Sequence, residues 1–180
     1  MKKSFISLLF FISFFAFSQE KASVKKSLTG VQIGFFGVDF YNEARLSDEF
    51  SLRSQFTLNP AIWGGDMYSK TGFALSPEIS ITPKYYYNLQ KRINQSKNNN
   101  NSGNYLALKL GYIPNWFVIS NSGVAVNQSI VLIPTWGLRR NFSKNFNYEF
   151  KAGIGLGKIL KLGYRVQVAP DIGFKIGYDF

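Results

Sequence analysis

The chain has 180 residues and no Cys, which excludes disulfides and a lipid-modified N-terminal Cys. It also has no His, which excludes Ser-His-Asp and Cys-His nucleophile systems and the commonest zinc ligand set. The formal net charge of +11 would suit nucleic acid, but the cations are dispersed and form no basic stripe, so we expect anionic lipid headgroups to attract them instead.

The N-terminus predicts a cleavable export signal over residues 1–18. Two lysines precede an apolar run, 5–17, that is too short and too closely followed by polar residues for a helix that stays in a membrane. Small residues stand three and one positions before the expected cleavage point, which lies between Ser18 and Gln19. A retained inner-membrane anchor is the alternative.

The mature chain of 162 residues (180 minus 18) has a size typical of one domain. We divide it into a short polar N-terminal segment, 19–27, and a β-barrel domain, 28–180. In the barrel domain apolar and polar residues alternate, which places them on opposite faces of extended strands. The alternation predicts seven strands, at about 28–45, 50–58, 72–90, 104–119, 127–140, 146–157 and 164–180.

The first of these strands is the least regular, because its apolar residues change parity midway. They occupy odd positions up to Phe35 and even positions from Val38 onward. A β-bulge around Phe36-Gly37 would cause such a shift, and Gly tolerates the backbone geometry that a bulge requires. We therefore predict one bulged strand at 28–45.

The last strand is the most regular. From Tyr164 to Phe180 every even position is apolar or Pro, and every odd position is polar or small. A soluble strand averages about five or six residues, whereas a tilted membrane-spanning strand needs about nine to eleven. Because Pro cannot donate a hydrogen bond to a ladder, we expect some of the prolines of the predicted strands near strand ends or bulges. These are Pro77, Pro83, Pro134 and Pro170.

Seven strands leave one membrane crossing unaccounted for. Bacterial single-chain barrels have an even number of strands, starting from eight. If the last strand ends at the periplasmic face, the two shortest turns, 47–49 and 141–145, are periplasmic as well, but the first strand then starts outside. The eighth strand could lie within 20–36, or the pairing of 110–130 could be more complex than one hairpin, and the sequence leaves both open.

The polar face of the predicted strands carries charges of both signs. An eight-stranded barrel is just wide enough to be filled by its own side chains, and buried opposite charges must pair to offset their desolvation. We therefore predict a filled, salt-bridged lumen, with a narrow ion-conducting lumen as the alternative. The candidate lumen charges are Arg53, Glu78, Lys84, Lys109, Arg139, Glu149, Lys151, Arg165, Asp171 and Lys175.

Three segments carry a resemblance to a known group of proteins. They are Phe17-Ser18-Gln19-Glu20 at the end of the signal, Tyr85-Tyr86-Tyr87-Asn88-Leu89, and the terminal Gly177-Tyr178-Asp179-Phe180. With these segments the chain resembles small outer-membrane β-barrel proteins of Bacteroidetes-type bacteria, with an OmpA/OmpX-like barrel architecture. The resemblance implies that the barrel-assembly machinery reads the C-terminal strand, a role that would fall on Phe180, with Tyr178 and Phe174 behind it.

Pattern and resemblance together predict an all-β, antiparallel, up-and-down transmembrane β-barrel of eight strands in the outer membrane. We expect no enzymatic activity, no cofactor and no metal site, but a structural or loop-mediated interaction role with the loops 60–72 and 115–126 outside. The expected partners are outer-membrane lipids, the barrel-assembly machinery and an extracellular partner that the sequence does not identify, with no nucleic acid. The alternatives are a narrow solute or ion channel, and a soluble lipocalin-like periplasmic barrel whose apolar face surrounds a ligand.

Overall fold

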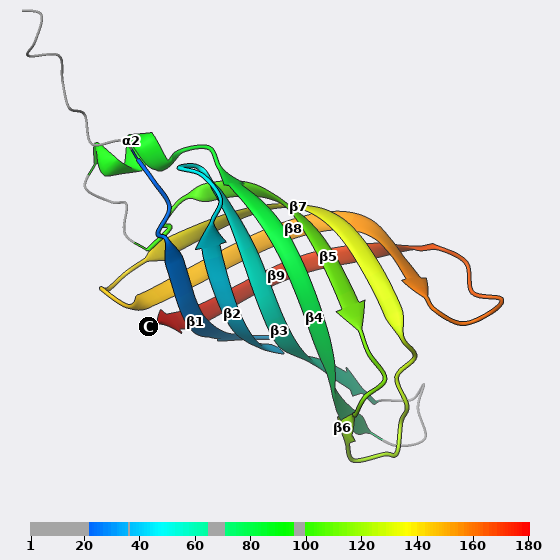
Figure 1. Ribbon diagram of the computed structural model, residues 1–180. Helices are drawn as coiled ribbons and strands as arrows, with labels where there is room; N and C mark the ends of the chain where they lie inside the picture. Colours follow the sequence, from blue (N-terminus) through cyan, green and yellow to red (C-terminus); the bar gives the residue numbers. More distant parts are fainter. Residues whose placement is uncertain (1–21, 36, 65–70, 96–99) are drawn as a thin grey trace, which may run out of the picture.

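The computed structural model describes residues 22–35, 37–64, 71–95 and 100–180 (Figure 1). The predicted signal, 1–18, and its cleavage point lie outside these residues. The regular secondary structure of the described part is all strand apart from one short helix, α2. The elements are β1 (Ser27–Gly34), β2 (Gly37–Arg45), β3 (Phe50–Trp63), β4 (Gly72–Tyr86), α2 (Leu89–Ile93), β5 (Asn104–Ile113), β6 (Ile119–Ser120), β7 (Ser129–Asn141), β8 (Phe146–Ile159) and β9 (Gln167–Asp179).

Eight of the strands form a closed barrel. Each strand from β1 to β5, and then β7, β8 and β9, pairs with the next one antiparallel, and β9 pairs with β1 to close the ring. Every connection in the ring therefore joins neighbouring strands, as in an up-and-down barrel. This arrangement confirms the predicted all-β, antiparallel, up-and-down fold and its eight strands.

The eighth strand, which the alternation did not resolve, is β1 at the start of the barrel. It lies within 20–36, which was one of the two predicted alternatives. The predicted single strand at 28–45 is a hairpin of β1 and β2, in which Gly34 pairs with Gly37. The predicted bulge was therefore wrong. A hairpin in which Gly34 pairs with Gly37 changes the parity of the inward positions just as a bulge would, and this is the change that the sequence shows. Gly37 has a φ of 108°, a conformation that favours glycine and suits the tight reversal.

The pairing between β5 and β7 is also more complex than one hairpin. β5 ends at Ile113, before the predicted end at 119, and the short β6 then pairs with β4 through Ala74↔Ser120 and Leu75↔Ile119. β4 in turn ends at Tyr86, and the residues that follow form α2 instead of continuing the predicted strand to 90.

Pro77, Pro83, Pro134 and Pro170 all lie inside strands. At each of them one of the two neighbouring strands has no residue paired with the proline. Pro83 falls between the β4–β5 pairs at 81 and 84, and Pro134 falls in a similar gap between β7 and β8. Pro77 lies between the stretches of β4 that pair with β6 and with β5. Pro170 lies beyond the last β9 residue that pairs with β1. The missing N–H of each proline therefore removes no ladder bond on that side.

The two faces of the barrel wall differ in the way that the alternation predicts. In β9 the odd positions from Gly173 to Asp179 are buried, whereas Ile172, Phe174 and Ile176 are 58%, 44% and 47% exposed. Polar side chains thus fill the inside and apolar ones cover the outside, the reverse of a lipocalin-like barrel. No helix among the described residues is long and apolar enough to cross a membrane.

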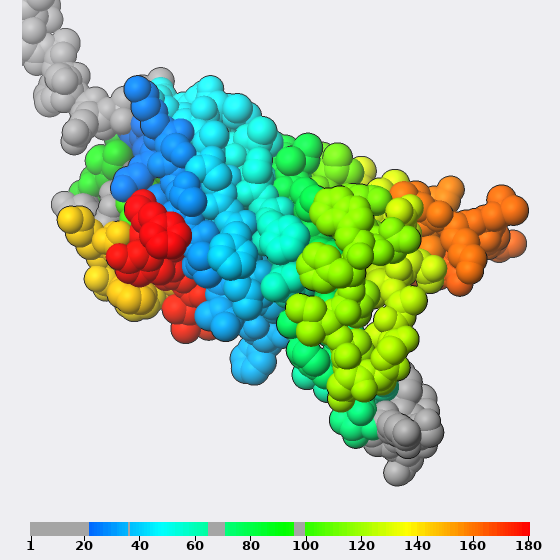
Figure 2. Space-filling model, turned by 60° about the horizontal axis from the view of Figure 1, so that its bottom comes forward, coloured from blue at the N-terminus to red at the C-terminus, as the bar shows by residue number. Residues whose placement is uncertain are grey.

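The two ends of the barrel carry different structures. At the end that holds Phe180, which we call the termini end, are the connections 46–49, 87–103 and 142–145 together with α2 (Figure 1). At the opposite end, the loop end, the connections 114–128 and 160–166 project from the wall as yellow-green and orange segments in Figure 2. β6 and the ends of β3 and β4 project there as well (Figure 1).

Candidate functional site

The barrel interior holds a balanced set of charges. The ion pairs join six cations to six carboxylates, so the charges of these side chains cancel. They are Arg53, Lys84, Lys109, Arg139, Lys151 and Lys175, and Asp39, Glu43, Glu78, Glu149, Asp171 and Asp179. Because each charge has an opposite charge beside it, the attraction between them offsets part of the free-energy cost of removing both from water.

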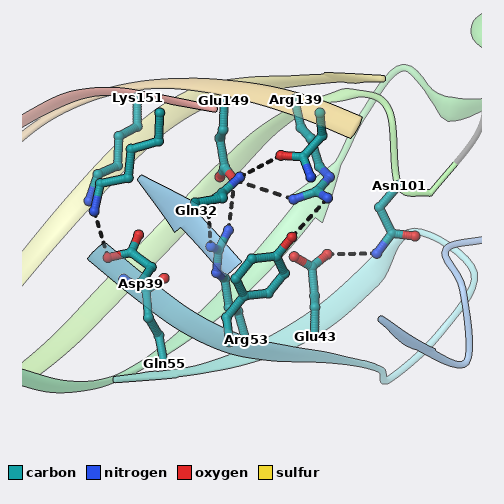
Figure 3. Close-up of polar contacts among 12 residues, drawn as sticks. Gln32, Asp39, Glu43, Arg53, Gln55, Asn101, Arg139, Glu149 and Lys151 are labelled. Carbon is teal, nitrogen blue, oxygen red and sulfur yellow. Dashed lines mark hydrogen bonds and ion pairs between the residues drawn. The ribbon is translucent and has the colours of Figure 1, made fainter. Parts of the chain in front are cut away.

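Glu149 on β8 is the centre of this network. Its carboxylate lies 2.7 Å from Arg53 Nη1 on β3, 2.8 Å from Lys84 Nζ on β4 and 3.5 Å from Arg139 Nη1 on β7. The hydroxyl of Tyr105 also donates to it. Figure 3 shows Arg53, Arg139 and Glu149 converging across the lumen. These contacts link β8 to four other strands, β3, β4, β5 and β7.

The interior aromatic rings need small neighbours. A Cβ on Gly137 would lie 2.3 Å from Cζ of Tyr105, and a Cβ on Gly30 would lie 2.6 Å from the hydroxyl oxygen of Tyr41. The two glycines thus let the tyrosines lie flat across the lumen, where Arg53 stacks 3.8 Å from the ring centre of Tyr41.

A second group of contacts closes the termini end. Asp179 accepts from Arg139 Nη2 at 2.5 Å and from the Tyr41 hydroxyl at 2.6 Å. Glu43 Oε1 accepts from the hydroxyl of Tyr86 at 2.8 Å, and its Oε2 lies 3.4 Å from Lys84. All of these side chains are buried.

A loop cap covers this end from outside. Asn100 and Asn101 are buried with φ values of 45° and 56°, and the Asn101 amide donates to Glu43 at 2.8 Å (Figure 3). Asn101 Oδ1 accepts from the backbone N–H of Lys25 at 2.7 Å, and Arg139 Nε donates to the backbone oxygen of Asn100 at 3.1 Å. Above these contacts lies an apolar cluster of Ala22, Val24, Tyr86, Leu89 and Tyr105. The cap is thus bonded to the charges that fill the lumen.

The loop end is open by contrast. Here Lys175 pairs with Asp39 at 2.5 Å, Lys109 with Glu78 at 2.6 Å, and Lys151 with Asp171 at 2.8 Å. The three lysines, with Glu78 and Asp171, form the floor of a cavity of about 470 Å³, which we call the vestibule. Beneath them the space shrinks to a cavity of about 40 Å³ beside Arg53, Lys84 and Glu149. The described interior thus forms a blind funnel.

The structure brings nine of the ten candidate lumen charges into this interior. Arg165 is the exception, because the β8–β9 ladder stops at Gly157↔Gln167 and Arg165 lies exposed in the connection beyond it. The sequence did not single out the inward-facing Gln32, Tyr41, Glu43 and Tyr105. Extending the alternation through β2 as a separate strand would have found Tyr41 and Glu43.

The residues assigned to barrel assembly lie on the outer surface of β9. Phe180 is 75% exposed, and its ring centre lies 5.6 Å from that of Tyr178. Its backbone N–H donates to the Thr29 oxygen of β1 at 2.9 Å. Phe174, four residues before Tyr178 on the same face, packs against Tyr148 with ring centres 6.2 Å apart. The end of the chain is therefore held at the β1–β9 seam.

Within the described residues, no group of three acidic, His or Cys side chains is arranged to hold a metal ion. No family model and no curated protein matches this chain.

Proposed function

We propose that the chain is an outer-membrane β-barrel protein without enzymatic activity, exported by its N-terminal signal. The observation that carries the proposal is the uncharged apolar belt around a polar, charge-balanced interior. Along β9 the outward positions from Val168 to Tyr178 span the length of about nine to eleven residues that a tilted membrane strand requires. Closing the ring leaves no open edge along the paired part of the belt, as hydrocarbon surroundings demand.

The exposed charges support the same placement. In the described part of the chain the outward positions between the two ends carry no charged side chain. The exposed cations lie at the ends instead, at Lys25, Lys26, Arg45, Lys91 and Lys144 on the termini end and at Lys158, Lys161 and Arg165 on the loop end. Cations at both boundaries of an apolar belt suit the phosphate level of a bilayer.

The loop end supports an interaction role. β3 and β4 continue past the barrel to Trp63↔Gly72, and β6 adds to the edge of β4. Ile62, Trp116 and Ile119 are 77%, 63% and 54% exposed on this projection. Exposed apolar side chains on a structure that stands clear of the belt are typical of a surface that meets a partner. This projection includes parts of the two loops, 60–72 and 115–126, that we expect outside.

Cell fractionation tests the membrane placement. After expression with the signal intact, the protein should sediment with the outer membrane, resist salt and urea washes, and run with heat-modifiable mobility after detergent extraction. Its N-terminus should begin at Gln19. Recovery of folded mature protein in the detergent-free soluble fraction would overturn the proposal.

Labelling of intact cells tests the orientation. An epitope inserted at Gly123, which has a φ of 63° and open space around it, should bind antibody on intact cells. The matched insertion at Lys144, in the short turn of the termini end, should bind only after the outer membrane is permeabilised. The opposite labelling pattern would place the projection in the periplasm and remove the proposed interaction role.

A further inference from the structure

The barrel wall has a notch at the loop end, because β1 and β2 are shorter than their neighbours. The β1–β2 ladder ends at Gly34↔Gly37, whereas β8–β9 continues to Gly157↔Gln167 and β3–β4 to Trp63↔Gly72. Among the described residues, the edge of β9 at 167–173 and the edge of β3 at 59–63 therefore have no strand between them. In Figure 1 the β8–β9 hairpin and the end of β3–β4 with β6 leave the barrel in different directions.

Each edge of the notch carries a proline. Pro60 pairs with Leu75 and Pro170 pairs with Ile154, each through the side of its strand that faces away from the notch. Proline has no N–H to donate to an added strand, and it is one of the residues that keep edge strands from pairing. The sequence thus opposes closure of the notch by further β-pairing.

The vestibule reaches the outside through this notch. Its lining includes Thr57 and Asn59 on β3 and the segment 169–172 on β9, which are the two sides of the notch. Apolar side chains surround the opening, with Phe35 88% and Val168 67% exposed. The opening therefore lies at the loop-side part of the apolar belt.

The vestibule has one apolar wall. The inward positions of β5 and β7 at this level are Ile113, Val131 and Ile133, whereas the opposite wall on β3 and β4 is polar. The next residue of the wall is Gly157, where an added Cβ would stand 3.3 Å from Val131 Cγ1 and 3.4 Å from Ala169 Cβ. Three inward aliphatic residues break the rule that the interior is polar, and an apolar ligand would remove them from water.

In each of the three ion pairs at the loop end the cation is more exposed than its carboxylate. The side chains are 21% and 14% exposed in Lys151 and Asp171, 13% and 6% in Lys109 and Glu78, and 6% and 3% in Lys175 and Asp39. An ammonium group has three N–H donors, and Lys151 donates one hydrogen bond, to Asp171. An anionic group that entered the vestibule would meet these donors first.

We propose that the vestibule binds a single-chain amphiphile with an anionic head group, which enters sideways through the notch. The head group contacts Lys151 and Lys109, and the chain lies against Ile113, Val131 and Ile133. A volume of about 470 Å³ falls within the range of about 300–1,000 Å³ that is usual for small-molecule sites. The route of access rests on the proposed membrane placement, whereas the contacts in the vestibule do not.

Methyl NMR in phosphatidylcholine nanodiscs tests this proposal, with decanoate as the probe. Saturable shifts are expected at the methyl groups of Val131 and Ile133, beyond the linear partitioning seen with empty nanodiscs. Lys151→Gln should weaken the binding about tenfold, which corresponds to about 1.4 kcal/mol. The matched Lys158→Gln, on the same strand but exposed outside, should leave it unchanged, and Gly157→Leu should block it by filling the wall.

Decyltrimethylammonium, with the same chain length and the opposite charge, should give no saturable shift. Shifts that are linear in decanoate, equal for both amphiphiles or unchanged in Lys151→Gln and Gly157→Leu would overturn the inference. Heat-modifiable mobility shows that each variant is folded in the nanodisc before the titration. Failure of the native barrel to enter nanodiscs at all would instead contradict the proposed membrane placement.

Discussion

Glu149 connects more of the interior than any neighbouring residue discussed above. Arg53, Lys84, Arg139 and Tyr105 reach it from four other strands, and the contacts to Arg53 and Lys84 close sequence separations of 96 and 65 residues. Removing one side of a buried ion pair is costly because the remaining charges stay buried without compensation. At this position one substitution leaves several cations facing each other.

Glu149→Gln should therefore destabilise the folded barrel by about 3–5 kcal/mol. Equilibrium urea unfolding in lipid vesicles measures the change. Glu49→Gln, at an exposed turn of the termini end, is the matched control and should change the unfolding free energy by less than about 0.5 kcal/mol. Equal effects of the two substitutions would show that the interior network does not stabilise the barrel.

The cap depends on Asn101 both for its amide and for its backbone. Asn101→Gly keeps the positive φ of 56° but removes the hydrogen bond to Glu43. Asn101→Ala removes the same bond and adds strain of about 1–2 kcal/mol, because an alanine disfavours this conformation. Limited proteolysis of the 94–103 connection should therefore be faster in Asn101→Ala than in Asn101→Gly, and slowest in the native chain. The same rate in all three would mean that Asn101 does not hold the cap.

At the scale of elements, the sequence predicts faces better than connections. The alternation identifies the inward residues of β8 and β9 because one side of each strand is polar along its whole length. It cannot tell a bulge from the tight hairpin between Gly34 and Gly37, because both shift the parity by one. The hairpin is decided by the pairing of β1 with β9, a contact between the two ends of the chain. The sequence also does not predict which charges form ion pairs inside the barrel, because the partners depend on the register between strands that lie far apart in the chain.

The two faces of β9 lead to an insertion test. Ile176 is 47% exposed in the apolar belt, four residues before the end of the chain. Ile176→Arg should reduce insertion, by less than the cost of about 2–4 kcal/mol at the midplane, because the cost of Arg falls toward the membrane boundaries. Gln167→Arg, at the exposed loop end of the same strand, is the control and should insert normally. The folded-band intensity after refolding into vesicles reports both. A normal folded band for Ile176→Arg would contradict the assignment of the outer face.

At the scale of the whole molecule, the filled lumen bears on transport. Arg53, Lys84 and Glu149 lie across the funnel beneath the vestibule, and the cap covers the other end. We therefore expect no stable single-channel current when the purified barrel is added to a planar bilayer. Steady, ion-selective steps from the native protein, absent in Glu149→Gln or altered in size by it, would instead favour the channel alternative.

In the proposed membrane placement the apolar belt contacts lipid while the projection at the loop end contacts water. Trp136 belongs to the belt and donates to the Tyr87 hydroxyl at 2.9 Å, whereas Trp116 lies 63% exposed on the projection. The direct measurement is the fluorescence of single-Trp variants in vesicles with brominated acyl chains, in which the other two tryptophans are replaced by Phe. We predict strong bromine quenching and weak iodide quenching for Trp136, and the reverse for Trp116. Trp136 emission that responds to iodide and not to bromine would contradict the account.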